Sequence, residues 1–324
     1  MYDTKVLQLR INEELSGFCL PESPENLYGP IGYMLQIGGK RIRPLLVLMA
    51  ADLFSLPAIE EALPAALAVE FFHNFSLVHD DIMDNAPLRR GQRTVHEKWD
   101  TNVAILSGDH LLIMAYAQLT KCPPNKLPSL LAAFNTMATQ VCEGQQLDMD
   151  FESTTHVGID DYLHMIRLKT SVLLGTALKM GAILADADDA DAQLIYDFGV
   201  NVGIAFQLQD DILDVYGDPQ QFGKQLGGDI LAGKKTYLLL RALEKSDAET
   251  KADLNQWLME HSRPSEKIDR VTAIYNRLGL RQEVESAKQL YVERAHAALD
   301  AIAQQENRKI PLRTLARNLL NRTH

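Results

Sequence analysis

Residues 59–84 constrain the fold of this chain more than any other stretch. They are almost wholly apolar, contain no glycine, and end in the acidic motif Asp80-Asp81-Ile82-Met83-Asp84. A long apolar segment of this kind is expected for a helix in the middle of a bundle. No segment of the chain shows a sustained alternation of apolar and polar residues, so the sequence offers no case for a β-sheet. The sequence therefore predicts an all-α fold.

The remaining segments also follow a helical period, and no shift in composition marks a linker. We expect a single all-α domain over residues 1–324, a large helical bundle with a central active-site cavity. The glycine-rich residues 217–233 are expected to form a loop. Helices are predicted over residues 6–15, 27–37, 40–56, 59–84, 103–119, 127–151, 160–187, 191–216, 235–244, 248–260, 268–306 with a break near 278–279, and 312–320.

Composition narrows the class of ligand. Of the 324 residues, 46% are hydrophobic and 23% are charged, as in a globular protein. The net charge of −11 argues against nucleic-acid binding, because a phosphate backbone demands a basic surface. The basic residues nevertheless cluster at Lys40-Arg41-Ile42-Arg43, Arg89-Arg90 and Lys234-Lys235. Basic clusters in an acidic protein indicate small phosphorylated ligands.

Cysteine usage and the N-terminus bear on localisation. Cys19, Cys122 and Cys142 are widely spaced and form no CxxC pair, which fits reduced thiols in a reducing compartment. The first residues show no signal-peptide pattern. The apolar runs are too short to span a bilayer. A cytoplasmic protein without a transmembrane segment is expected.

Two acidic clusters carry the clearest chemical signal. Asp80 and Asp84 share a helix face, and Asp210-Asp211-Ile212-Leu213-Asp214 repeats the pattern after another apolar run. Carboxylates this close repel one another, a divalent cation would remove the repulsion, and oxygen ligands select Mg²⁺. Two alternatives stay open. Each cluster could be a solvated helix end, or His79-Asp80 with His73 could form the metal site of an HD-type phosphohydrolase.

Cations accompany the acidic clusters. Arg89-Arg90 directly follow the first cluster, where guanidinium groups are well placed for phosphate oxygens. The motif Gly38-Gly39-Lys40-Arg41-Ile42-Arg43-Pro44 puts three cations just after a glycine turn at a helix start, which favours a diphosphate. Taken alone, either group could be ordinary surface charge.

The second half of the chain adds further candidates. Lys169-Thr170 interrupts an apolar helix, so the lysine needs a partner such as a carboxylate or a bound diphosphate. Gln207 lies three residues before Asp210, on nearly the same helix face. Gly223-Lys224 and Lys234 fall in or beside the glycine-rich stretch, as expected for a lid over a phosphorylated substrate.

Together these residues resemble the trans-isoprenyl diphosphate synthases, or polyprenyl synthetases, over nearly the whole chain. The resemblance rests on several motifs in the family's order, a highly specific pattern. They are Gly38 to Pro44, the first aspartate motif with Arg89-Arg90-Gly91, Gly144-Gln145-Gln146-Leu147-Asp148, Lys169-Thr170, Phe206-Gln207 through Asp214, and Gly223-Lys224 through Asp229.

The resemblance implies a homodimeric all-α bundle in which the two aspartate motifs face each other across a deep cavity. It implies three Mg²⁺ ions, held mainly by Asp80, Asp84 and Asp210. An allylic diphosphate would be bound with the help of Arg89, Lys169, Thr170, Gln207, Lys224 and Lys234. Isopentenyl diphosphate would be bound by Lys40, Arg43, His73 and Arg90.

The expected reaction is ionisation, condensation and elimination. Metals and cations draw the diphosphate away and leave an allylic cation. Oxygens of Thr170, Gln207 and nearby carbonyls stabilise that cation, so these two residues and Lys169 are the expected catalytic residues. The isopentenyl double bond attacks C1, and a proton is lost to the released pyrophosphate. The allylic substrate would be dimethylallyl, geranyl or farnesyl diphosphate.

Product length should depend on the depth of the cavity below Asp80. Phe72 and Phe75 share a helix face, although both could be plain core aromatics. In the family, a large residue five before the first aspartate, here Phe75 beside the small Ser76, goes with short products, so C15 to C20 is predicted. Arg93 departs from the family, where proline is common, and puts the conformation of the loop around Gly91 in doubt.

Three alternatives remain beside the short-chain enzyme. The first is a synthase of longer chains. The second is a class I terpene cyclase, disfavoured because the second motif is all aspartate. The third is a non-catalytic partner subunit, which would be expected to lack aspartates that are present in both motifs here.

Overall fold

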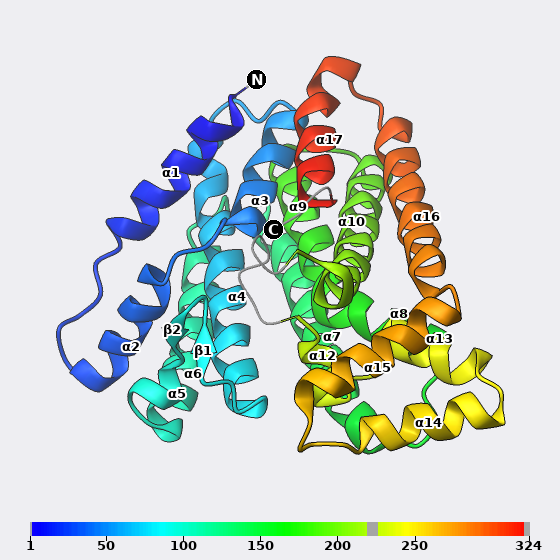
Figure 1. Cartoon of the computed structure of the whole chain (residues 1–324). Coiled ribbons are helices and arrows are strands. Elements are labelled where there is room, and N and C mark those ends of the chain that lie inside the picture. The colour runs from blue at the N-terminus through cyan, green and yellow to red at the C-terminus, as the bar shows by residue number, and fades with distance from the viewer. Residues whose placement is uncertain (1, 219–225, 321–324) are drawn as a thin grey trace. The chain divides into compact units, whose positions relative to one another are not determined.

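The computed structural model describes residues 2–218 and 226–320. Its described residues are overwhelmingly helical, which confirms the all-α prediction (Figure 1). The elements in chain order are α1 (Thr4–Ser16), α2 (Glu25–Gln36), α3 (Ile42–Leu53), the 3₁₀ helix η1 (Ile59–Ala62), α4 (Leu63–Met83), β1 (Leu88–Arg89), β2 (Gln92–Arg93), α5 (Val95–Lys98), α6 (Thr101–Leu119), α7 (Leu127–Ser153), α8 (Ile159–Ile166), the π-helical η2 (Arg167–Ser171), α9 (Val172–Leu184), α10 (Asp189–Tyr216), α12 (Gly228–Ala232), α13 (Tyr237–Lys245), α14 (Ala248–Leu258), α15 (Pro264–Arg277), α16 (Leu280–Ala301) and α17 (Glu306–Leu320).

The prediction that the chain has no strands is wrong at one place, the loop after α4. There β1 pairs with β2 in an antiparallel hairpin, with Arg89 opposite Gln92. The two residues between them, Arg90 and Gly91, have φ of 52° and 74°. Positive φ at both central residues is typical of the tight turn that closes two-residue hairpins. Glycine adopts positive φ without strain, but arginine rarely does, so the pair Arg90-Gly91 is a weak sequence signal for a hairpin turn.

Several other boundaries differ from the predictions, and two of the differences have a clear local cause or position. The stretch 217–233, expected to be a loop, contains the short helix α12, which begins after Gly227 and ends at Gly233. Both glycines have positive φ, 74° and 66°, so they act as helix ends rather than as loop residues. The last helix begins at Glu306, ahead of Pro311, and not after it.

The chain divides into two compact units. Unit 1 comprises Met1–Met137, Leu173–Tyr196 and Ile302–Pro311, and unit 2 comprises Ala138–Val172, Asp197–Ala301 and Leu312–His324. Each unit is described by itself, and the single domain over residues 1–324 stays a prediction.

In unit 1, α4 packs against α3 and α6 (Figure 1). Both α3 and α4 are almost wholly buried up to the last turns of α4, so α4 is the core helix that its apolar sequence predicted. Burial decreases over the last turns of α4, so the helix carries Asp80 and Asp84 to an accessible end while Asp81 stays buried.

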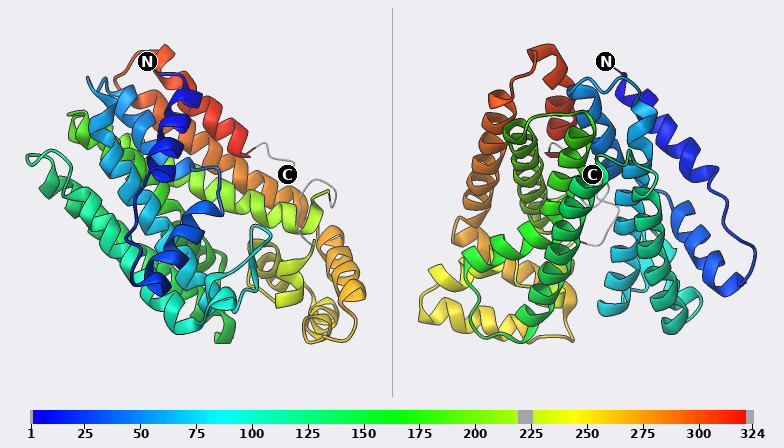
Figure 2. Two further views of the ribbon diagram at one scale, coloured as in Figure 1. Left: turned by 90° about the vertical axis from the view of Figure 1, so that its left-hand side faces the viewer. Right: turned by 180° about the vertical axis from the view of Figure 1, so that it is seen from behind.

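In unit 2, α15 packs against α12, α13, α14 and α16. The helices α10 and α16 run side by side, as both views of Figure 2 show. This places the second aspartate motif, in the last turns of α10, next to the first half of α16. Among the helices that the structure describes, none is both long enough and apolar enough to cross a membrane.

Candidate active site

The first candidate site lies in unit 1, at the C-terminal end of α4. Asp80 is in the last turn of the helix and its side chain is 20% exposed, while Asp84 is exposed at the C-cap. Asp81, between them, is buried, with a side chain only 2% exposed. The helix thus sorts its three carboxylates into two accessible groups and one internal group.

Arg89 of β1 pairs with the buried carboxylate. Its Nε lies 2.8 and 2.9 Å from the two oxygens of Asp81, and one Nη lies 2.7 Å from Oδ1 of Asp81 and 3.3 Å from Asp80. Burial raises the pKa of Asp81 although the guanidinium opposes that shift. The hairpin therefore delivers a cation that holds the middle aspartate of the motif.

A basic cluster lies in the same unit, around the start of α3. Nη1 of Arg43 lies 3.0 Å from Nε2 of His73 on α4, and Arg90 donates to the carbonyl of Gly38. Arg41 is buried and pairs with Glu70. Lys40 is exposed beside them. The structure therefore brings Arg43, His73 and Arg90 together.

The electrostatics of this cluster suit an anion. Burial and the neighbouring arginines keep the pKa of His73 well below its usual value, so its imidazole is neutral. Burial lowers the pKa of Arg43 to about 10, with Glu70 opposing the shift and Arg90 adding to it. Nε of Arg43 is buried and has no hydrogen-bond partner among the described residues. Gathered cations with an unused donor are suited to phosphate oxygens.

The second candidate site lies in unit 2 and is built on a break in helix geometry. Lys169 and Thr170 belong to η2, and π-helical turns of this kind often occur at functional sites. Nζ of Lys169 lies 2.6 Å from Oδ2 of Asp148 on α7, and Lys234 lies 3.7 Å from the same oxygen. Burial would raise the pKa of Asp148, but Lys234 and Lys169 hold it below its usual value. The carboxylate partner expected for Lys169 is therefore Asp148.

The second aspartate motif ends α10 in the same unit. Asp211 is 3% exposed and accepts hydrogen bonds from the Tyr162 hydroxyl at 2.5 Å and the Tyr237 amide at 3.4 Å. Burial raises its pKa to about 7. Gln207 contacts the other oxygen at 3.5 Å. Asp210 and Asp214 are partly exposed, as the ends of the first motif are.

The donor set can be tested against Mg²⁺. In the part of the chain that the structure describes, no three carboxylate, imidazole or thiol groups form a metal cage by themselves. Mg²⁺ seldom needs one, because it is usually bound through one or two carboxylates together with water and substrate phosphates. Asp80, Asp84 and Asp210 are accessible hard donors, whereas Asp81 and Asp211 are buried and hydrogen-bonded. The residues fit the ion.

The alternative metal site of an HD-type phosphohydrolase has no support. Nε2 of His79 lies 3.1 Å from the carbonyl oxygen of Ile105 and 3.7 Å from Asp109, and His73 contacts Arg43. In the part of the chain that the structure describes, neither imidazole belongs with Asp80 to a group that could hold a metal ion.

The residues proposed for chain length form an aromatic layer on α4. Phe72 is buried, and its ring centroid lies 5.5 Å from that of Phe75 and 5.4 Å from that of Phe134. Phe75 is partly exposed, and its ring centroid also lies 4.8 Å from that of His79. His79 immediately precedes Asp80. Ser76 donates to the carbonyl oxygen of His73 at 2.9 Å.

The sequence did not predict the role of several residues of the candidate sites, and one predicted residue lies outside the described part of the chain. Asp148 and Arg41 stand inside motifs that the sequence singled out, yet only packing identifies their partners. Tyr162 has no recognisable signal because its partner Asp211 lies on another helix. Lys224 lies outside the described residues. Arg93, whose departure from the family put the loop in doubt, lies in β2, and its carbonyl accepts from Tyr33 at 2.7 Å.

Comparison with known proteins agrees with this geometry. Residues 24–278 match the family described as polyprenyl synthetase. The chain is 38% identical over 289 residues to a short chain isoprenyl diphosphate synthase of Methanocaldococcus jannaschii, covering 89% of this chain and 85% of that one. It is 42% identical over 224 residues to a geranylgeranyl diphosphate synthase of Methanosarcina mazei, covering 68% and 69%.

The fold is likewise similar to solved structures. A crystal structure of a geranylgeranyl pyrophosphate synthase superposes with a TM-score of 0.94, at 43% identity and over 99% of each chain. An all-helical fold with two aspartate clusters and a basic cluster defines a prenyltransferase. The chain belongs to the polyprenyl synthetase family.

Proposed function

We propose that this enzyme condenses isopentenyl diphosphate with an allylic diphosphate to give a short trans-prenyl diphosphate, about C20 in length. The observation that carries the proposal is the sorting of carboxylates at both motifs. In each, the outer aspartates are accessible and the middle one is buried and hydrogen-bonded. The names of the relatives, short chain and geranylgeranyl diphosphate synthases, support the product class.

Isopentenyl diphosphate is assigned to the basic cluster of unit 1. Arg43, Arg90 and Lys40 supply positive charge, and neutral His73 supplies a ring nitrogen without adding charge. The unused Nε of Arg43 is a donor available to a phosphate oxygen. Held through its diphosphate, the substrate presents a neutral double bond as the nucleophile.

The allylic diphosphate is assigned to Asp80, Asp84 and Asp210 through Mg²⁺, and to the cations Arg89, Lys169, Lys234 and Lys224. When bound, Mg²⁺ supplies positive charge that stabilises the departing diphosphate. In the described structure Asp148 holds the ammonium groups of Lys169 and Lys234 near one point. That pre-orientation lowers the reorganisation needed when the leaving group becomes negative.

The remaining steps need no side-chain nucleophile. Ionisation leaves an allylic cation, and the side-chain oxygens of Thr170 and Gln207 are assigned to stabilise it. The double bond of isopentenyl diphosphate attacks C1, which forms the new carbon–carbon bond. A proton then leaves the adjacent carbon for the released pyrophosphate, which restores the double bond.

Product length is assigned to the aromatic layer of α4, with Phe75 as its first ring and Phe72 beneath it. Phe75→Ala removes the partly exposed ring, so products longer than those of the wild type are expected, by one or two isoprene units. Ser76→Ala is the matched control, since it removes only a hydroxyl bonded to its own helix. Chromatography of dephosphorylated products measures the length, and an unchanged product from Phe75→Ala refutes the assignment.

A homodimer and a cytoplasmic location complete the proposal. The helix α6 exposes large apolar side chains, with Leu106 59% and Ile113 60% exposed, which supports burial against a second copy. The three cysteines are free thiols, as expected in a reducing compartment. Sedimentation measures the particle mass, and a mass of twice that of the chain is expected for the homodimer.

The decisive experiment is a product assay. The protein is incubated with Mg²⁺, isopentenyl diphosphate and either dimethylallyl, geranyl or farnesyl diphosphate, and the products are sized. Condensation to about C20 is expected. No condensation with any primer refutes the proposal and favours the non-catalytic partner subunit, whereas products of C30 or more favour the long-chain alternative.

A further inference from the structure

One face of α16 contacts α10 on either side of the second aspartate motif. Arg281, Glu285 and Lys288 are spaced i, i+4, i+7 and share that face. Nζ of Lys288 donates to Oε1 of Gln209 at 2.7 Å and lies 3.0 Å from Oε2 of Glu285. Gln209 is 7% exposed and immediately precedes Asp210. The contact therefore reaches α10 at the first turn of the motif.

The second contact is made at the other end of the motif. The guanidinium of Arg281 lies 5.1 Å from the centroid of the Tyr216 ring, two residues after Asp214. The hydroxyl of Tyr216 is buried without a hydrogen-bond partner in the described part of the chain. The described contact of Tyr216 with a charged group is therefore the one between its ring face and the guanidinium of Arg281.

The two contacts are in register. Seven residues forward on α10, from Gln209 to Tyr216, correspond to seven residues back on α16, from Lys288 to Arg281. The helices are therefore antiparallel, and the contacts bracket the aspartates. We call Lys288, Arg281 and their partners Gln209 and Tyr216 the α16 clamp.

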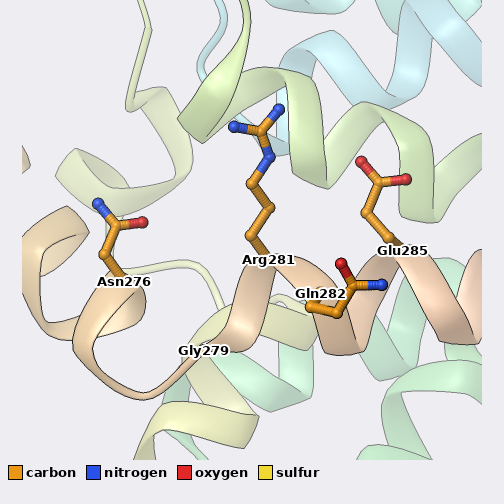
Figure 3. A pocket seen from close by; sticks show the side chains of 5 residues that line it. All are labelled: Asn276, Gly279, Arg281, Gln282 and Glu285. Carbon is orange, nitrogen blue, oxygen red and sulfur yellow. The ribbon is translucent and has the colours of Figure 1, made fainter.

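The start of α16 is held to α13 through Glu283, which pairs with Arg241 and Lys245, and it borders open space at the turn before it. It follows Gly279, and a Cβ at this position would meet no atom within 4 Å. A hollow of about 350 Å³ borders the turn, lined by Asn276, Gly279, Arg281, Gln282 and Glu285. Figure 3 shows Arg281 and Glu285 rising from the same side of α16. The contacts of Glu283 reach α13, whereas those of the clamp join this end of α16 to α10.

The charges of the clamp oppose the repulsion within the motif. Asp210, Asp211 and Asp214 lie within about two turns of helix, and repulsion among them favours distortion of that end of α10. Lys288 and Arg281 are cations at the two ends of the same segment. A hydrogen bond to a charged ammonium is also stronger than one between neutral groups.

We propose that Lys288 and Arg281 are positioning residues for the second aspartate cluster. They touch neither substrate nor metal, and act by holding α10 so that Asp210 is presented to Mg²⁺. The inference rests on the proposed role of Asp210. If the contact only joined two helices, its loss would lower stability alone. A positioning role predicts that its loss also raises the Mg²⁺ concentration needed for half-maximal rate.

The test uses Lys288→Met and Arg281→Met, which remove the charge and keep the stem. Arg294→Met is the matched control, because Arg294 also lies over a tyrosine, Tyr291 at 5.2 Å, on α16 itself. Both clamp variants are expected to raise the Mg²⁺ concentration for half-maximal rate about tenfold, the scale of groups that orient metal ligands. The KM for isopentenyl diphosphate is expected to stay constant, because its assigned residues are in unit 1.

A second readout does not depend on turnover. The rise in melting temperature on adding Mg²⁺ with inorganic pyrophosphate should shrink in both clamp variants and stay at the wild-type value in Arg294→Met. Gln209→Leu should match Lys288→Met, and the double variant should be no worse than either. Lys288→Arg keeps a charged donor and should restore most of the Mg²⁺ response, even if Lys288→Met folds poorly.

The outcomes separate the two proposals. Clamp variants with the Mg²⁺ dependence of Arg294→Met overturn the positioning role and leave the proposed function intact. A wild-type protein that condenses nothing at any Mg²⁺ concentration refutes the proposed function itself, and the melting experiment then decides the clamp alone.

Discussion

The two aspartate motifs are nearly identical in sequence but are neutralised by different means. In unit 1 the middle carboxylate, Asp81, receives a two-pronged guanidinium from Arg89. In unit 2 the equivalent carboxylate, Asp211, receives a phenol and a backbone amide, and burial raises its pKa to about 7. One motif is balanced by a charge, and the other by neutral donors.

This difference shows that the pattern Asp-Asp-x-x-Asp contains two kinds of residue. The outer aspartates are accessible in both units and are the ones proposed to bind metal. The middle aspartate anchors its motif to the surrounding fold, through the hairpin in unit 1 and through α8 in unit 2. An anchor that depends on an ion pair and one that depends on burial should respond differently to mutation and to pH.

The largest effect is expected at the outer positions. Asp80→Asn and Asp210→Asn each remove a charged oxygen proposed to bind Mg²⁺, and kcat should fall by about 100- to 1000-fold, the cost of losing one group that stabilises a transition state. Steady-state kinetics at saturating Mg²⁺ measure the effect, and the melting temperature without metal serves as the folding control. A loss below tenfold at either position breaks the equivalence of the two motifs.

The anchors themselves should differ in the stability that they contribute. Arg89→Met leaves Asp81 buried without its cation, and the free energy of unfolding should fall by about 3 kcal/mol. Tyr162→Phe should cost about 1 kcal/mol, since it removes one hydrogen bond. Urea unfolding of the metal-free protein at pH 7.5 compares the two variants, and equal losses contradict the distinction drawn between the anchors.

The pH dependence of Tyr162→Phe has a definite sign. The phenol hydrogen-bonds the ionised form of Asp211, whose pKa is about 7. Near pH 6 this carboxyl is mostly protonated in the folded protein, so the bond to the charged form contributes less. The deficit of Tyr162→Phe should therefore be smaller at pH 6 than at pH 8, whereas that of Arg89→Met should change less.

In each unit, one glycine allows a cation of the candidate site to lie close to the backbone. Replacing these two glycines by alanine should destabilise the protein to different degrees. A Cβ at Gly144 would lie 2.3 Å from the backbone nitrogen of Lys169, which cannot move without shifting η2. A Cβ at Gly39 would meet the side chain of Arg90 at 2.6 Å, which can swing away, although φ of 137° adds strain. Gly144→Ala should lower the free energy of unfolding by about 2–3 kcal/mol and Gly39→Ala by about 1 kcal/mol.

Kinetics sharpen the glycine comparison. Gly39→Ala should raise the KM for isopentenyl diphosphate more than that for the allylic substrate, because Arg90 is displaced. The reverse order for Gly144→Ala is expected, because Lys169 is displaced. An allylic KM that rises more in Gly39→Ala than in Gly144→Ala contradicts the assignment of Arg90 to isopentenyl diphosphate and of Lys169 to the allylic diphosphate.

The smallest effect concerns His73. Its pKa is well below 6.5 in the folded protein because of burial and the arginines around it. The unfolded chain therefore binds a proton that the folded chain does not, and stability falls as pH drops below about 6.5. Between pH 7.5 and 5.5 the wild type should lose about 1 kcal/mol more than His73→Gln. Parallel unfolding profiles of the two proteins show that His73 titrates normally.

The sequence by itself determined the helices and pointed to most of the candidate site residues. Helical period, glycines and prolines act within a few residues, so the boundaries of α4, α7 and α10 could be predicted closely. The aspartate clusters, Lys169-Thr170 and the basic motif at residues 38–44 were visible because their residues are adjacent in the chain. The hairpin after α4 was missed because its turn depends on positive φ at an arginine.

Only the tertiary structure decided which charged and polar side chains contact one another. The pairs Asp81 with Arg89, Asp148 with Lys169, and Asp211 with Tyr162 join different elements, and the register of α10 against α16 joins residues 65 to 79 positions apart. Such contacts depend on how side chains of different helices interdigitate, a property of packing that local periodicity does not encode. For the same reason, the difference in burial between the middle aspartates and the outer ones, which are proposed to bind metal, emerges only when the chain is folded.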